Sequence, residues 1–73
     1  MKINQENLIE VIQSVVEISE DVNIESKFSD LGFDSMDHAA IILEIEEKFK
    51  ISISNNIYGE LNSIKDILRY LNK

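Results

Sequence analysis

The sequence predicts an all-α protein, a small bundle of four helices with a long loop between the first two and a short third helix. Apolar residues recur at intervals of three and four residues over most of the chain, which is typical of amphipathic helices. Polar residues that commonly cap helices stand before several of these runs. With 73 residues the chain has room for one core, and we expect a single domain over residues 1–73.

The first helix is expected from about Asn4 to about Glu17. Its apolar stripe and the positions beside it are Leu8, Ile12 and Val15, then Ile9 and Val16. Asn4 can cap this helix, and Ile3 and Leu8 then stand at the two ends of a hydrophobic staple. This end of the chain lacks the charged and then apolar pattern of a signal peptide.

No clean helical period follows, and we expect a long loop over residues 18–33. Its apolar residues are spaced as anchors on a core: Val22, Ile24, Phe28 and Leu31. A loop of this length without secondary structure of its own is uncommon in a compact domain and usually argues against such an assignment.

The second helix is expected from Ser35 to Lys50. At about 100° per residue one face forms a core stripe of His38, Ile42, Ile45 and Phe49, with Ile41 at its margin. The opposite face carries the apolar residues Met36, Ala40 and Leu43, with Asp37, Glu44 and Glu47 around them. An outward apolar strip ringed by acids indicates a surface for transient protein partners, although scattered exposed aliphatic residues are also common.

Two shorter helices complete the predicted bundle. The third is expected from Asn55 or Asn56 to Leu61. Ser63 and Asp66 have the spacing of a capping box at the start of the fourth helix. The apolar residues of that helix follow at helical spacing: Ile64, Ile67, Leu68 and Leu71.

The charge of the chain is strongly negative. Fourteen acids against seven bases give a net charge of −7, and no lysine or arginine lies between Lys27 and Lys48. Such a field repels nucleic acid and anionic lipid and favours partners with basic surfaces, although a merely solvated acidic face would look the same. Glu44, Glu46 and Glu47 also leave weak cation binding open, but we expect no metal site.

Several functions are disfavoured by composition. The chain has no cysteine, and no apolar run approaches the length of a membrane span. No glycine-rich phosphate loop or basic aromatic surface appears, so we expect no nucleic-acid partner. We expect a cytoplasmic monomer that does not insert into membranes.

The most informative stretch is Asp34-Ser35-Met36-Asp37, which follows Leu31-Gly32-Phe33. The start of a helix presents unpaired N–H groups and the positive end of the dipole, which favour an anion near Ser35. Ser35 could equally be a plain helix N-cap.

The sequence from Asp30 to Asp37, with Glu46-Glu47-Lys48-Phe49 further on, resembles the acyl carrier proteins. The resemblance implies that Ser35 carries a covalent 4′-phosphopantetheine arm derived from coenzyme A, with Asp34 as its motif neighbour. It also implies a phosphopantetheinyl transferase as a partner, together with acyl-transferring and synthase enzymes that have basic docking patches. The expected partner-binding residues are Met36, Asp37, Ala40, Leu43, Glu44 and Glu47.

This sequence departs from carriers of fatty acid synthesis at some positions. Ala39 and Ala40 replace a hydrophobic residue and an acid, and His38 is not the residue expected from the family. The departures leave room for a related pathway, namely polyketide, non-ribosomal peptide or D-alanyl transfer.

A catalytic role and an adaptor role are the alternatives to a group carrier. His38 is three residues from Ser35, but a nucleophile and base also need an orienting acid and an oxyanion site, so we expect no catalytic residue. The alternative function is an unmodified acidic helical adaptor that binds a basic partner protein, in which Ser35 only caps its helix.

Overall fold

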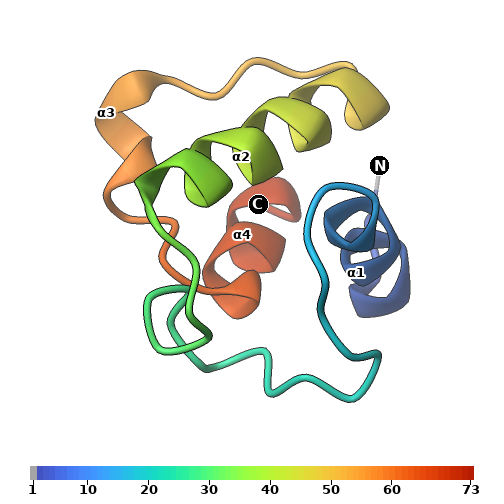
Figure 1. The fold of residues 1–73 in the computed structure, drawn as a ribbon. Coiled ribbons are helices and arrows are strands. Elements are labelled where there is room, and N and C mark those ends of the chain that lie inside the picture. The colour runs from blue at the N-terminus through green and yellow to red at the C-terminus, as the bar shows by residue number, and fades with distance from the viewer. Residues whose placement is uncertain (1) are drawn as a thin grey trace.

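The computed structural model describes residues 2–73, and within them the fold is all-helical, as predicted. The helices are α1 (Gln5–Gln13), α2 (Ser35–Phe49), α3 (Asn55–Tyr58) and α4 (Ile64–Leu71). Helix α1 packs against both α2 and α4. Figure 1 shows α2 crossing above α4, with α1 on one side and short α3 on the other. The long loop and the short third helix are confirmed.

Most of the core residues are isoleucines, and most of these lie on the apolar faces of the amphipathic helices. The fully buried side chains are Leu8, Ile12, Ile41, Ile42, Ile45, Ile64 and Ile67. Ile41, which was predicted at the margin of its stripe, is therefore a central core residue. The other two residues of the predicted α2 stripe, His38 and Phe49, are half-buried at the edges of the core.

The start of α1 is as predicted, but its end is not. The Asn4 side chain accepts a hydrogen bond from the Asn7 N–H at 2.7 Å, and Ile3 and Leu8 are both buried. The helix ends at Gln13, four residues before the predicted end. The Ser14 hydroxyl donates to the Val11 carbonyl at 2.6 Å as the helix stops, and Val15 is 38% exposed.

Backbone hydrogen bonds join the loop between α1 and α2 to the residues at the start of α4. The Phe28 N–H donates to the Asn62 carbonyl at 2.8 Å, and the Lys65 N–H donates to the Ile24 carbonyl at 2.9 Å. Lys27 and Ser63 form an antiparallel bridge. The predicted anchors pack against the core, with Phe28 only 4% exposed. These bonds hold the loop beside the starts of α2 and α4.

The α2–α3 connection depends on an acid of α2. Helix α2 ends at Phe49, one residue earlier than predicted, and Lys50 caps it in the left-handed conformation with φ 56°. Glu46 is half-buried, and its Oε2 accepts a hydrogen bond from the Ile53 N–H at 2.7 Å. Glu46 therefore holds the chain that leaves α2.

Helix α3 is shorter than predicted. It ends at Tyr58, so Leu61 lies beyond it, although the Leu61 side chain is still only 3% exposed. At the next helix, Ser63 accepts a hydrogen bond from the Asp66 N–H, as in the predicted capping box. The Asp66 carboxylate accepts from the Asn62 N–H instead of the Ser63 N–H, so the reciprocal half of that box is shifted by one residue.

The Asn72 side chain joins the two ends of the described chain through two hydrogen bonds to the backbone of Ile3. The Asn72 amide accepts from the Ile3 N–H and donates to the Ile3 carbonyl, both at 2.8 Å. Among residues 2–73, no helix is long and apolar enough to cross a membrane.

Candidate functional site

Helix α2 starts with a reciprocal cap made by two aspartates. Asp34 is the N-cap residue, and its Oδ1 accepts a hydrogen bond from the Asp37 N–H at 2.9 Å. Asp37 Oδ2 accepts from the Asp34 N–H at 3.3 Å. The two bonds satisfy donors that the start of a helix leaves without intrahelical partners. Asp34, and not Ser35, is therefore the capping residue.

Ser35 is the first residue of α2, and its side chain is exposed. Within residues 2–73 its hydroxyl has no hydrogen-bond partner, and neither do the N–H groups of Ser35 and Met36. The interpretation of Ser35 as a plain N-cap is thus wrong. An accessible hydroxyl beside two free N–H groups is a donor set that fits a phosphodiester.

The turn before Ser35 requires a glycine. Gly32 has φ 90°, a conformation in which side-chain-bearing residues are strained. The Gly32 N–H donates to the Ser29 carbonyl at 3.2 Å, and the Phe33 N–H donates to the Phe28 carbonyl at 3.0 Å. This tight turn brings the loop directly to the start of α2.

His38 connects the start of α2 to the segment before α4. Its Nε2 lies 2.7 Å from the Leu61 carbonyl oxygen, and because a carbonyl only accepts, Nε2 carries the proton. The ring centroid is 5.6 Å from that of Phe28 and 6.4 Å from that of Tyr58. His38 is half-buried in this aromatic group and has a structural partner. The helical spacing places it toward the core, but sequence reasoning did not find the bond to Leu61.

A surface pocket of about 350 Å³ opens beside Ser35. Its charged and polar walls include Lys27, Asp34 and Asn62, and Phe33 and His38 contribute aromatic surface. These residues come from the loop, from α2 and from the segment before α4. No sequence pattern could have joined them, because the pocket exists only where the loop is bonded to Asn62 and Ser63.

The outward face of α2 carries the predicted apolar strip. Met36 is 79% exposed and Leu43 58% exposed, and Ala40 and Glu47 are exposed as well. Met36, Ala40 and Leu43 therefore lie on the side of α2 that faces away from the core. The predicted exposure of the strip is confirmed.

The acids around this strip differ in their surroundings. Glu47 is exposed, whereas Asp37 and Glu44 are half-buried. The Asp37 carboxylate takes part in the α2 cap, and Glu44 lies 3.4 Å from the Ser14 hydroxyl at the end of α1. Glu47 is therefore the most accessible of these three carboxylates.

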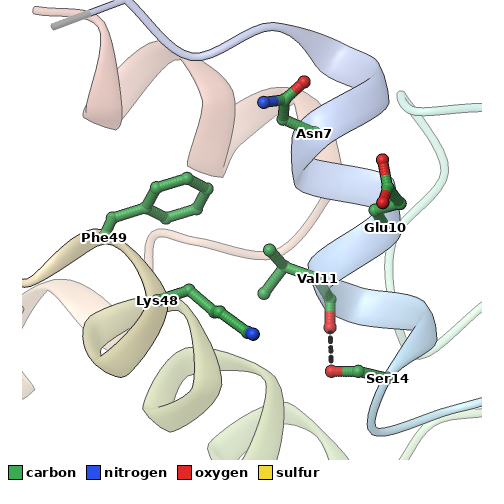
Figure 2. Close-up of a pocket in the computed structure, with 6 residues that line it drawn as sticks. All are labelled: Asn7, Glu10, Val11, Ser14, Lys48 and Phe49. Carbon is green, nitrogen blue, oxygen red and sulfur yellow. Dashed lines mark hydrogen bonds between the residues drawn. The ribbon is translucent and has the colours of Figure 1, made fainter.

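A second pocket, of about 300 Å³, lies between α1 and the C-terminal end of α2, away from Ser35 (Figure 2). It is lined by Asn7, Glu10, Val11, Ser14, Lys48 and Phe49. Figure 2 shows the Ser14 hydroxyl turned back to the Val11 carbonyl, not into an interaction with another wall residue. Among the described residues, no group of three or more His, Asp or Glu side chains could hold a metal ion. The candidate site is the start of α2, where the exposed Ser35 hydroxyl stands beside the free N–H groups of Ser35 and Met36.

Comparison with known proteins gives a consistent answer. Residues 6–71 match the family described as "Phosphopantetheine attachment site". The chain is 36% identical over 69 residues to the acyl carrier protein of Syntrophus aciditrophicus (strain SB), covering 92% of this chain and 86% of that protein. It is 33% identical over 66 residues to the acyl carrier protein of Trieres chinensis, covering 82% of each. With the acyl carrier protein of Campylobacter concisus (strain 13826) it shares 40% identity over 53 residues, covering 71% of this chain and 69% of that protein.

The helical fold, the free hydroxyl at the start of α2 and these matches agree with one another. The family match covers all four helices except the first residue of α1. The chain belongs to the acyl carrier proteins and contains the phosphopantetheine attachment domain of that family.

Proposed function

We propose that Ser35 is the residue to which the 4′-phosphopantetheine arm is attached. The observation that supports this assignment is that Asp34, and not Ser35, caps the helix. Asp34 caps α2, which leaves the Ser35 hydroxyl exposed and without a partner among residues 2–73. The free N–H groups of the first turn favour the negative charge of a phosphodiester at this position. When bound, the arm supplies a thiol that holds an acyl group as a thioester.

The chain itself contributes presentation and not catalysis. Ser35 lies at the start of helix α2, where its side chain is exposed. The turn at Gly32 sets the direction in which the α1–α2 loop enters this helix. The Nε2 of His38 bonds to the Leu61 carbonyl, which gives this side chain a structural role. We therefore assign the chemistry to separate enzymes: a phosphopantetheinyl transferase and then acyl-transferring or synthase enzymes. A single domain over residues 1–73, acting as a monomer in the cytoplasm, is part of this proposal.

The partner enzymes are proposed to dock on the outward face of α2. Met36, Ala40 and Leu43 offer the apolar contact, and their exposure supports this role. Asp37, Glu44 and Glu47 would attract basic patches on those enzymes, with Glu47 the most accessible. The pathway served is proposed to be fatty acid synthesis or a related one, polyketide, non-ribosomal peptide or D-alanyl transfer.

The intact mass of the protein after treatment with coenzyme A and a phosphopantetheinyl transferase tests this assignment. We expect the wild type to gain one phosphopantetheine group and Ser35→Ala to gain none. Ser29→Ala is the matched control, because Ser29 is an exposed serine in the same pocket. Absence of an adduct on the wild type with several transferases would favour the unmodified acidic adaptor. An adduct on Ser35→Ala would place the attachment elsewhere.

A further inference from the structure

We propose that Lys27, Phe33 and Asn62 form a resting site for the part of the arm nearest Ser35, with Lys27 holding its phosphate. The proposal rests on the assignment of Ser35 as the attachment residue. It adds a binding role for three residues that lie outside α2, in the pocket of about 350 Å³ beside Ser35.

The charges around Ser35 create a need for a cation. A phosphodiester on Ser35 adds a negative charge between Asp34 and Asp37, on a chain whose net charge is already −7. Neighbouring like charges repel each other, and salt screens the repulsion only in part at separations below the Debye length of about 8–10 Å. Lys27 is the one lysine or arginine that lines the pocket beside Ser35.

The Lys27 ammonium group is available for this role. The salt bridge found within residues 2–73 joins Lys65 to Glu25, with 3.9 Å between nitrogen and oxygen. Lys27 therefore has no acid of residues 2–73 within 4.0 Å. The backbone of Lys27 is nevertheless held in place, through its bridge to Ser63 and the bond from Phe28 to Asn62. The side chain thus extends from a fixed point on the pocket wall.

The other walls match the groups that follow the phosphate in pantetheine. These are a carbon bearing two methyl groups, a hydroxyl and an amide. Phe33 and Phe28 provide an aromatic wall for the methyl groups, with ring centroids 6.2 Å apart. Asn62 uses its Nδ2 to donate to the Gly59 carbonyl at 2.8 Å, and its Oδ1 has no partner within residues 2–73. That oxygen can accept a hydrogen bond from the hydroxyl or the amide.

The size of the pocket limits what it can hold. A volume of about 350 Å³ lies at the lower end of ligand pockets. A pocket of this size suits one segment of the arm. The proposed resting site therefore holds the part of the arm nearest the phosphate and not the whole arm.

Nuclear magnetic resonance of the apo and arm-bearing forms tests the proposal. We expect attachment of the arm to shift the backbone amide signals of Lys27, Phe33 and Asn62. We also expect the ³¹P signal of the phosphodiester to move in Lys27→Gln and to stay at the wild-type position in Lys27→Arg. Since exposed ion pairs are worth up to about 1 kcal/mol, Lys27→Gln should lower occupancy of the resting site by up to about fivefold.

Lys48→Gln is the matched control, since it removes the same charge from an exposed position at the far end of α2. Its ³¹P signal and amide shifts should match the wild type. The proposal is overturned if arm attachment leaves the amides of Lys27, Phe33 and Asn62 unshifted. It is equally overturned if Lys27→Gln and Lys48→Gln give the same ³¹P signal. A wild type that gains no arm at Ser35 refutes the proposed function instead, so the two failures are distinguishable.

Discussion

Replacing Ile42 with alanine should remove much of the stability of the protein, while the same change at its neighbour Leu43 should not. Ile42 is fully buried, and the change removes three carbons, worth about 2.4 kcal/mol in burial alone. The cavity left behind raises the expected loss to about 2–5 kcal/mol. At about 0.05–0.15 kcal/mol per residue, a chain of 73 residues has a total stability of about 4–11 kcal/mol. The loss is thus a large part of the whole.

Urea denaturation followed by circular dichroism measures the difference. With a denaturant dependence of about 1 kcal/mol per molar urea, Ile42→Ala should lower the midpoint by about 2–5 M. Leu43 is 58% exposed, so Leu43→Ala should change the free energy of unfolding by no more than about 0.5 kcal/mol. If Leu43→Ala proves the more damaging, the assignment of the two faces of α2 is wrong, and the docking surface must be redrawn.

Three further predictions concern the charged residues. The melting temperature should rise between low and moderate salt, because salt screens the repulsion within a chain of net charge −7. Within residues 2–73 one salt bridge, Lys65–Glu25, offsets this repulsion. A melting temperature that stays flat or falls with salt would contradict this. In chemical denaturation, Glu46→Ala should cost about 1–3 kcal/mol, because it leaves the Ile53 N–H without its charged acceptor, and Glu47→Ala should be near neutral. Equal effects of the two changes would refute the role of Glu46. Glu47→Lys should slow association with a partner enzyme in stopped-flow measurements, and an effect that persists at high salt would argue against electrostatic attraction.

The fold could be predicted from the sequence because its helices are strongly amphipathic. The stripes of α2 and α4 supply the core residues Ile42, Ile45, Ile64 and Ile67, as their spacing indicates. Helix ends were less predictable, because they depend on local competition for backbone groups. At Ser14, a side chain bonds to a carbonyl of the last turn, and periodicity carries no signal of this.

The candidate site could be predicted only in part, for a similar reason. The motif directed attention to Ser35, but the sequence alone left both a modified serine and an N-cap open. Asp34 and Ser35 are both good capping residues, and the choice between them is made by the geometry of the turn after Gly32. The roles of Glu46 and Lys27 depend on contacts across the fold. The sequence analysis placed Glu46 among the acids of α2 and in the stretch that resembles acyl carrier proteins. It did not predict that the Glu46 carboxylate holds the α2–α3 connection.

The most direct test of the central claim is to locate the arm on the chain. After treatment with coenzyme A and a transferase, cleavage at Lys27 and Lys48 releases a peptide that contains both Ser29 and Ser35. Fragmentation of this peptide in a mass spectrometer should show the phosphopantetheine mass on fragments that include Ser35 and on none that include only Ser29. An arm found on Ser29, or on a peptide from another part of the chain, would contradict the assignment of Ser35.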